Sequence, residues 1–188
     1  GGPPVLDLLL SRLPVVPAAL FIVQHGPQWV QAQLVERLSG KSRMPVQLAR
    51  DGEHIQPESV YIAPAGSHLT IADGYRFALR SDPPENGTRP AADPLLRSMA
   101  RTFGHRALSV VLTGLGKDAA SGSAALFTVG GGVIVQNPES ATAPFMPKSV
   151  LNAGVAATQC DVDELAAAVV AEVRKRQPRE AAHHSVRM

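Results

Sequence analysis

Two short stretches decide the fold of this chain: Val110–Asp118 (VVLTGLGKD) and Phe21–His25 (FIVQH). Each is an apolar, β-rich run that ends abruptly and is followed by a side chain capable of acid–base chemistry. In an open parallel sheet, the loops at the carboxyl ends of the strands form the crevice where ligands bind. We therefore expect His25 and Asp118 to meet at one edge of such a sheet.

Around these stretches, strand and helix patterns alternate almost from end to end, which favours an α/β fold. Strands are predicted at 18–23, 46–48, 59–63, 107–112 and 132–136, and an antiparallel hairpin over 69–79 with its turn at Asp73-Gly74. Helices are predicted near 5–12, 29–38, 93–102, 119–128, 146–152 and 161–176. The predicted fold class is α/β: a doubly wound, mostly parallel sheet flanked by helices, with a small antiparallel hairpin.

The end of the helix near 146–152 and the start of the final helix each carry a recognisable signal. Gly154 stands where helices stop, and Asp161 with Glu164 three residues later makes an acidic-capped start to the final helix. We expect one domain over residues 1–177 and a disordered basic tail over 178–188.

Composition excludes several classes of protein. No apolar run approaches the ~20 residues that span a bilayer, so membrane insertion is not expected. Residues 174–188 carry a net charge of +4, which leaves −2 on the rest of the chain and argues against a nucleic-acid partner. The single Cys160 excludes a disulfide framework and a cysteine metal site. It is expected to be an inert core thiol, and a reducing cytoplasm is the expected location.

Further blocks along the chain complete a family pattern. They are Gly1-Gly2-Pro3, Gln24-His25-x-Pro27, Asp51-Gly52-Glu53, Tyr61-Ile62-Ala63-Pro64, His68, Arg89-Pro90-x-x-Asp93, the Leu112–Asp118 turn, Gln136-Asn137 and Met146-Pro147. With these blocks the chain resembles the catalytic domain of the chemotaxis protein-glutamate methylesterases, from Gly1 to about Ala171. Single blocks would be weak evidence, but their order and spacing together are specific.

The resemblance implies a Ser-His-Asp triad, in which His25 matches the general base and Asp118 the carboxylate that orients it. In the family the serine lies in a Ser-x-Gly-Gly turn after the first strand, so Gly1 and Gly2 match the two glycines. The serine would stand two residues before Gly1, so the N-terminal strand and the nucleophile turn are expected to precede the chain. No cofactor is implied, because the triad suffices.

The chemistry gives a reason for each residue type. A histidine can take a proton from the serine near neutral pH and return it to the leaving alcohol. The oxyanion needs donors, which backbone N–H groups at the glycine turn (Gly1, Gly2) and at Leu115 and Gly116 could supply. Leu115 stands where the family usually has methionine, so substrate specificity could shift if that side chain packs on substrate.

The resemblance also implies substrates and partners. The expected reaction is hydrolysis of glutamate γ-methyl esters on the cytoplasmic helices of methylated chemoreceptors; family members often also deamidate glutamines. Arg89, His68 and Met146 are candidates for substrate binding. Family members commonly carry a receiver domain that gates the site, which makes such a domain a candidate partner.

Each candidate also has a structural alternative. His25 could be a partly buried structural histidine, and Asp118 could cap the helix near Ala119 or do both jobs. His68 could serve in a structural hydrogen bond, and Arg89 could pair with Asp93 four residues on.

Three further candidates are interpreted without catalysis. Ser121 and Ser123 are interpreted as turn residues rather than replacement nucleophiles. His183-His184 lacks a third ligand nearby, so no metal site is expected.

Two other functions remain to be weighed. A catalytically inactive binding or signalling module would keep the fold but lack the serine. A dinucleotide-binding domain fits poorly, because Gly114-x-Gly116 is followed by Lys117-Asp118-Ala119 rather than the fingerprint's x-x-Gly.

Overall fold

The computed structural model describes residues 2–177, and the side chains from residue 4 onward. Gly1, the tail 178–188 and its His183-His184 pair lie outside the described residues. The strands are β1 Ala19–Ile22, β2 Val46–Leu48, β3 Ser59–Ile62, β4 His68–Ala72, β5 Arg76–Arg80, β6 Leu108–Val111, β7 Gly132–Gln136 and β8 Thr158–Cys160. The helices are α1 Gly2–Arg12, α2 Gln28–Ser39, α3 Ala92–Phe103, the 3-10 turn η1 Gly104–Arg106, α4 Ala120–Thr128, α5 Phe145–Asn152 and α6 Leu165–Arg176.

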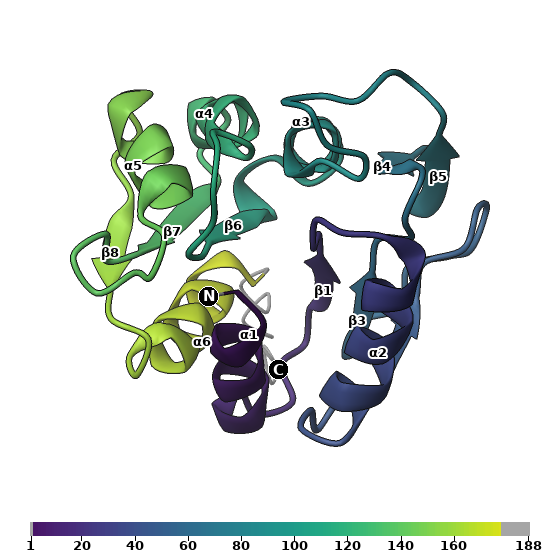
Figure 1. Ribbon diagram of the computed structural model, residues 1–188, viewed down its shortest axis with the longest axis horizontal. Helices are drawn as coiled ribbons and strands as arrows, with labels where there is room; N and C mark the ends of the chain where they lie inside the picture. Colours follow the sequence, from purple (N-terminus) through teal and green to yellow (C-terminus); the bar gives the residue numbers. More distant parts are fainter. Residues whose placement is uncertain (1, 178–188) are drawn as a thin grey trace, which may run out of the picture.

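The parallel strands form two separate three-stranded sheets, in the orders β1-β3-β2 and β6-β7-β8. Strands β4 and β5 form the antiparallel hairpin. Figure 1 shows the parallel strands lying between two groups of helices, with α3, α4 and α5 on the upper side and α1, α2 and α6 on the lower, and the hairpin beside α3. The predicted fold class is thus confirmed, with one addition: the parallel sheet is divided into two halves.

The division of side chains between two cores follows from the period of a strand. On β3, Val60 and Ile62 point into a core shared with α1, α2 and α6. Tyr61 points to the opposite face, into a core with the hairpin and α3. Successive side chains of a strand alternate between faces, so an all-apolar strand can serve two cores at once. This is the arrangement that a doubly wound sheet requires.

One unpredicted strand and the starts of two helices are the main differences from the sequence prediction. Strand β8 was not predicted, because three residues with two exposed polar side chains give no period to detect. The last helix begins at Leu165 rather than Asp161, since residues 162–164 form a turn. Glu164 does reach back to the Asp161 amide, at 3.3 Å. Helix α1 begins at Gly2, earlier than the predicted Val5, because prolines are tolerated in a first turn.

Candidate active site

The structure brings the two residues of the deciding stretches together. His25 follows β1 and Asp118 follows β6, and the imidazole Nε2 lies 2.7 Å from Asp118 Oδ2. The His25 side chain is 28% exposed, whereas Asp118 is 2% exposed. A solvent-accessible base supported by a buried carboxylate is the geometry from which a histidine can exchange protons with a substrate.

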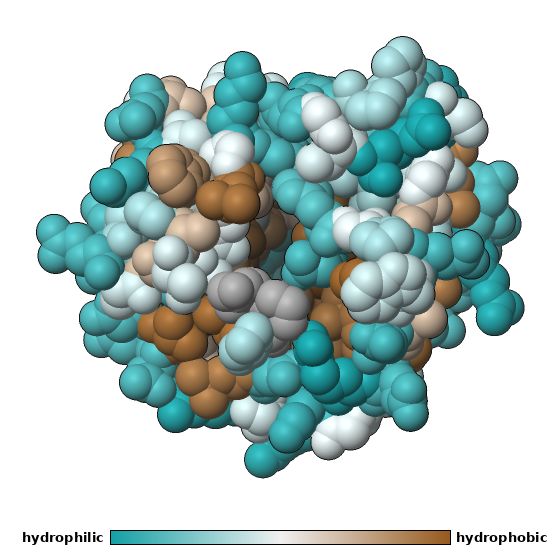
Figure 2. All heavy atoms as spheres, in the orientation of Figure 1, coloured by the Kyte–Doolittle hydropathy of each residue, from teal (hydrophilic) through white to brown (hydrophobic). Residues whose placement is uncertain are grey.

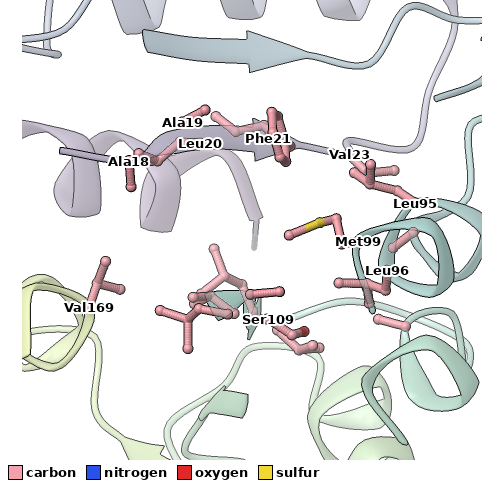
Figure 3. Close-up of a pocket in the computed structure, with 18 of the residues that line it drawn as sticks. Ala18, Ala19, Leu20, Phe21, Val23, Leu95, Leu96, Met99, Ser109 and Val169 are labelled. Carbon is pink, nitrogen blue, oxygen red and sulfur yellow. The ribbon is translucent and has the colours of Figure 1, made fainter. Parts of the chain in front are cut away.

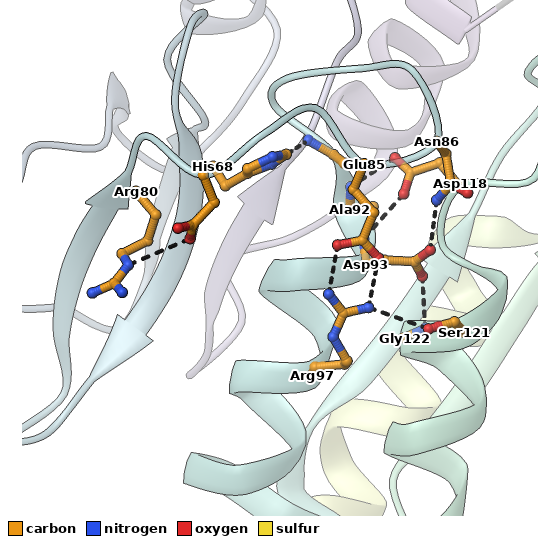
Figure 4. A network of polar contacts seen from close by, with 12 residues as sticks. His68, Arg80, Glu85, Asn86, Ala92, Asp93, Arg97, Asp118, Ser121 and Gly122 are labelled. Carbon is orange, nitrogen blue, oxygen red and sulfur yellow. Dashed lines mark hydrogen bonds and ion pairs between the residues drawn. The ribbon is translucent and has the colours of Figure 1, made fainter.

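The Asp118 carboxylate sits at the N-terminus of α3 (Figure 4). Its Oδ2 also accepts the Ala92 N–H at 2.6 Å, and its Oδ1 accepts the N–H groups of Asp93 and Ala119. Burial alone would raise the pKa of Asp118, but the hydrogen bonds from His25, Ala92 and Asp93 outweigh it and lower the pKa. Asp118 is therefore held as the anion that the imidazolium needs beside it.

Asp118 caps a helix, but not the predicted one. The residue before α4, Ala119, has a φ of 74° and offers no side-chain cap of its own. The carboxylate instead satisfies two free N–H groups of α3. The sequence spacing pointed to the next helix along the chain, whereas the tertiary fold presents another helix end to the same oxygens.

A buried glutamine that the sequence analysis missed holds the loop that carries His25. Gln31 on α2 is 1% exposed, and its Nε2 donates to the carbonyl oxygens of Gln24 and Gly26, both at 3.1 Å. These carbonyls flank His25 on either side. The only available signal was a polar residue beside the apolar stripe of α2.

The orientation of the His25 ring decides which nitrogen is free. Because Nε2 faces the ionised Asp118, it carries the proton in the neutral imidazole. Nδ1 is then the unprotonated nitrogen and the one that can accept a proton from a nucleophile.

The turn after β6 presents unused backbone donors. Gly114 N–H donates to the Ala143 carbonyl, and Met146 N–H donates to the Gly114 carbonyl. A side chain at Gly114 would overlap the Met146 sulfur, so the flexible Met146 side chain packs directly on this glycine. Within residues 2–177, the N–H groups of Leu115 and Gly116 donate no hydrogen bond, and the Leu115 side chain is 72% exposed. The tip of the turn is thus open to a ligand.

A cavity of about 840 Å³ separates the two half-sheets beside this site. It is lined by β1 on one side, by β6 on the other, and by apolar side chains of α1 and α3 such as Leu9 and Met99. Figure 2 shows the hollow in the middle of this face, with apolar residues along its edge. In Figure 3, Phe21 and Ser109 lie on opposite sides of the open space. Both flanking strands are sheet edges, paired on one side only.

Comparison with known proteins places the chain in a family. The sequence model described as CheB methylesterase matches residues 1–169. The chain belongs to the CheB methylesterase family. It is 36% identical over 174 residues to a protein-glutamate methylesterase/protein-glutamine glutaminase 2 of Nitratidesulfovibrio vulgaris, covering 90% of this chain and 47% of that protein.

Two other relatives support the assignment. A protein-glutamate methylesterase/protein-glutamine glutaminase of Salmonella typhimurium is 32% identical over 92% of this chain and 50% of its own length. The crystal structure of the Thermotoga maritima CheB methylesterase catalytic domain superposes with a TM-score of 0.87 at 34% identity, covering 91% of this chain and 93% of that one. The chain spans about half the length of the curated relatives it matches.

Two candidate substrate contacts of this CheB-family domain have partners within the protein. His68 is 2% exposed; its Nε2 donates to the Pro83 carbonyl and its Nδ1 accepts the Ala91 N–H. This favours the structural alternative for His68. Arg89 donates to the Ser81 and Asp82 carbonyls, and the alternative pair with Asp93 does not form.

Neither serine near Asp118 faces His25. Ser121 Oγ accepts from Arg97, and Ser123 Oγ bonds Ser109 Oγ at 2.9 Å in the core. These contacts agree with their interpretation as structural residues. Cys160 is buried, and burial raises the pKa of its thiol, which suppresses the reactive thiolate.

Two searches over the described part of the chain gave no site. Residues 2–177 contain no group of three or more His, Cys, Asp or Glu side chains placed to hold a metal ion. Among the same residues, no helix has the length and apolar character needed to cross a bilayer.

Proposed function

We propose that this chain is the catalytic domain of a protein-glutamate methylesterase that hydrolyses glutamate γ-methyl esters on chemoreceptors and also deamidates glutamines. The observation that carries the proposal is the 2.7 Å contact between His25 and Asp118 at the mouth of a cavity, in a CheB-family fold. The curated relatives carry both activities in their names. Methylated cytoplasmic receptor helices are the proposed partners, a receiver domain is the proposed regulator, and the cytoplasm is the proposed location.

In the proposed reaction, His25 Nδ1 takes the proton of a serine hydroxyl as the oxygen attacks the ester carbonyl. The imidazolium that forms is stabilised by the ionised Asp118. His25 then gives the proton to the methoxy oxygen, and methanol leaves. Water, deprotonated by the same nitrogen, attacks the acyl-serine, and the imidazolium returns the proton to the departing serine oxygen, so ester and water become carboxylic acid and methanol.

The oxyanion of the tetrahedral intermediate needs two donors. The N–H groups of Leu115 and Gly116 are candidates, because neither is used within the described residues and both lie in the turn that leads to Asp118. Leu115 then acts through its backbone, and its exposed side chain is free to touch the receptor helix. Met146, packed on Gly114, lies beside this turn and is a proposed wall of the substrate pocket.

We infer that the serine reaches the site on a further strand that fills the cavity between β1 and β6. Each of these strands has one edge with no strand partner. The backbone N–H and C=O groups on such an edge need hydrogen bonds, either from solvent or from another strand. A strand inserted parallel to both would join the half-sheets and end at the edge where His25 and Asp118 lie. It would lead directly into α1, whose first turn contains Gly2, as in a β-α-β unit.

The activity is tested with the complete gene product, which includes any residues encoded ahead of Gly1, and a receptor methylated with labelled methyl groups. We expect methanol release by this protein and negligible release by the chain from Gly1 to Met188, because no serine of its described part contacts His25. His105→Ala, which changes an exposed histidine on η1, is the matched control for His25→Ala. Equal methanol release by the 188-residue chain would refute the proposed origin of the nucleophile.

The inserted strand is tested by amide hydrogen exchange, without reference to activity. In the 188-residue chain, the amides of β1 and β6 should exchange faster than those of β3 and β7. In the complete gene product, the β1 and β6 amides should become as protected as those of β7. Unchanged exchange at β1 and β6 would show that the cavity holds no strand.

A further inference from the structure

We propose that Asp93 is a positioning residue for Asp118, and that the side-chain amide of Asn86 holds Asp93 in this role. The inference rests on the proposed function, since it concerns the carboxylate behind the general base. It adds two residues outside the triad on which the rate of the reaction depends.

Asp93 and Asp118 cap each other's helices. Asp118 accepts the N–H groups of Ala92 and Asp93 in the first turn of α3. The Asp93 carboxylate accepts the Gly122 N–H in the first turn of α4, at 2.6 Å. Because α4 begins two residues after Asp118, these bonds close a ring that runs from Asp118 to α3, across to α4, and back along the chain (Figure 4). Movement of either carboxylate therefore moves the other.

The ring depends on a close approach of α3 and α4. A Cβ at Gly122 would lie 2.6 Å from Leu96 Cβ and 3.0 Å from the Asp93 carbonyl oxygen. Only glycine lets the Gly122 N–H reach the Asp93 carboxylate without displacing α3. The position of Asp93 is thus fixed by backbone packing as well as by its hydrogen bonds.

Asn86 supplies the second donor to Asp93. Its Nδ2 lies 2.9 Å from Asp93 Oδ2, and Asn86 and Gly87 form a tight turn with φ values of 53° and 79°. The ends of this turn are tied by mutual backbone bonds between Glu85 and Thr88. The Glu85 carboxylate also forms a two-pronged ion pair with Arg97 on α3, at 2.7 and 2.6 Å. The turn is therefore fastened to α3 at two points, Asp93 and Arg97.

The chemistry of Asp93 explains why these donors matter. Burial raises the pKa of Asp93, as does the neighbouring Asp118 charge, while the hydrogen bonds from Gly122 and Asn86 act in the opposite direction. A 2%-exposed carboxylate that lost a donor would take up a proton or move toward water. Either change alters the α3 terminus on which Asp118 rests.

Asp118 tolerates little movement, because a single oxygen serves two partners. Oδ2 accepts both the Ala92 N–H and the His25 Nε2 proton. A shift of α3 pulls this oxygen from the imidazole, and a displacement of ~1 Å can lower a catalytic rate by ~100-fold.

The first test measures steady-state methanol release by the complete gene product. Asp93→Ala should lower kcat by about 10- to 100-fold with KM changed less than about twofold. Asp93→Asn, which keeps an oxygen for the Gly122 N–H, should recover part of kcat. Asn86→Gly keeps the turn's positive φ but removes the amide, and should lower kcat by about threefold.

The matched control is Ser98→Ala on the same helix. Ser98 is fully buried, and its hydroxyl bonds the Leu95 carbonyl and the Ile71 N–H rather than the site. This variant should lose stability but keep the wild-type kcat. A fall in kcat for Ser98→Ala equal to that for Asp93→Ala would reduce the Asp93 effect to general destabilisation of α3, and would overturn the proposal.

The second test needs no esterase activity and uses the 188-residue chain. Two-bond proton–nitrogen NMR correlations report which ring nitrogen of His25 is protonated. The wild type and Ser98→Ala should show Nε2–H, and Asp93→Ala and Asn86→Gly should lose part of that population. Wild-type tautomer populations in both site variants would refute the positioning role. A normal tautomer result with no methanol release by the wild type would instead refute only the proposed function.

Discussion

The central strand of each half-sheet and the strand that faces the cavity differ in burial, although their sequences are similarly apolar. Strands β3 and β7 are buried at every residue, and each is paired on both edges. Strands β1 and β6 have equally apolar sequences, yet β1 is only partly buried at three of its four residues. The difference is that β1 and β6 are paired on one edge only and face the cavity on the other. It shows that the two strands that deliver His25 and Asp118 are also the two edge strands that face the cavity.

Removing the base at the end of β1 should have the largest effect of any change. His25→Ala in the complete gene product should lower kcat by at least ~10³-fold, because the serine then has no proton acceptor. Asp118 would keep its hydrogen bonds to the N–H groups at the start of α3, so the fold around it should be preserved. The measurement is methanol release with His105→Ala as control. Retained turnover would mean that the edge between β1 and β6 is not the site.

Truncating a side chain in each kind of strand sharpens the comparison. Ile134→Ala in β7 should lower the free energy of unfolding by about 2–5 kcal/mol, because the side chain is fully buried. Leu20→Ala in β1 should cost only about 1 kcal/mol in the 188-residue chain, where the strand is half-buried. Urea denaturation measures both. In the complete gene product the two values should converge, and a persistent gap would argue against an inserted strand.

Lowering the pH should destabilise the folded protein by protonating Asp118. A carboxyl whose pKa is lowered by folding stabilises the protein above its unfolded pKa of ~3.9, and this stability is lost as pH falls toward the folded value. Below about pH 4, the wild type should therefore lose stability more steeply than Asp118→Asn. Denaturation midpoints between pH 2.5 and 5 (~0.5-unit steps) test this. The exposed Asp73→Asn in the hairpin turn is the control, and parallel curves for wild type and Asp118→Asn would contradict the prediction.

The smallest effect is expected at Arg89, away from the facing edges of β1 and β6. Its guanidinium holds the Ser81 and Asp82 carbonyls at 3.1 and 3.0 Å. Arg89→Ala should raise KM by less than about tenfold and leave kcat near wild type if the arginine also contacts the receptor. A loss of kcat matching that of His25→Ala would overturn the assigned roles.

Local patterns in the sequence were sufficient for most of the fold. Apolar runs ending in His25 and in the Gly114–Asp118 turn predicted parallel strands whose carboxyl ends meet, because strand direction and loop placement are linked in a doubly wound sheet. Hydrophobic period placed α2 and α3, and the Asp73-Gly74 turn placed the hairpin, within a few residues. Strand β8 escaped, since three residues carry no period.

Only the tertiary structure decided which partners complete the site. It directed Asp118 to the α3 terminus rather than to α4, brought Gln31 to the carbonyls beside His25, and buried His68 in structural hydrogen bonds. It also brought the Asn86 amide and the Gly122 N–H to the Asp93 carboxylate. Hydrogen bonds and burial depend on atoms brought together from distant parts of the chain, whereas hydrophobic period and turn chemistry are local. The sequence therefore determined where the reactive groups stand on the chain, and the packing of helices against the divided sheet determined what each of them touches.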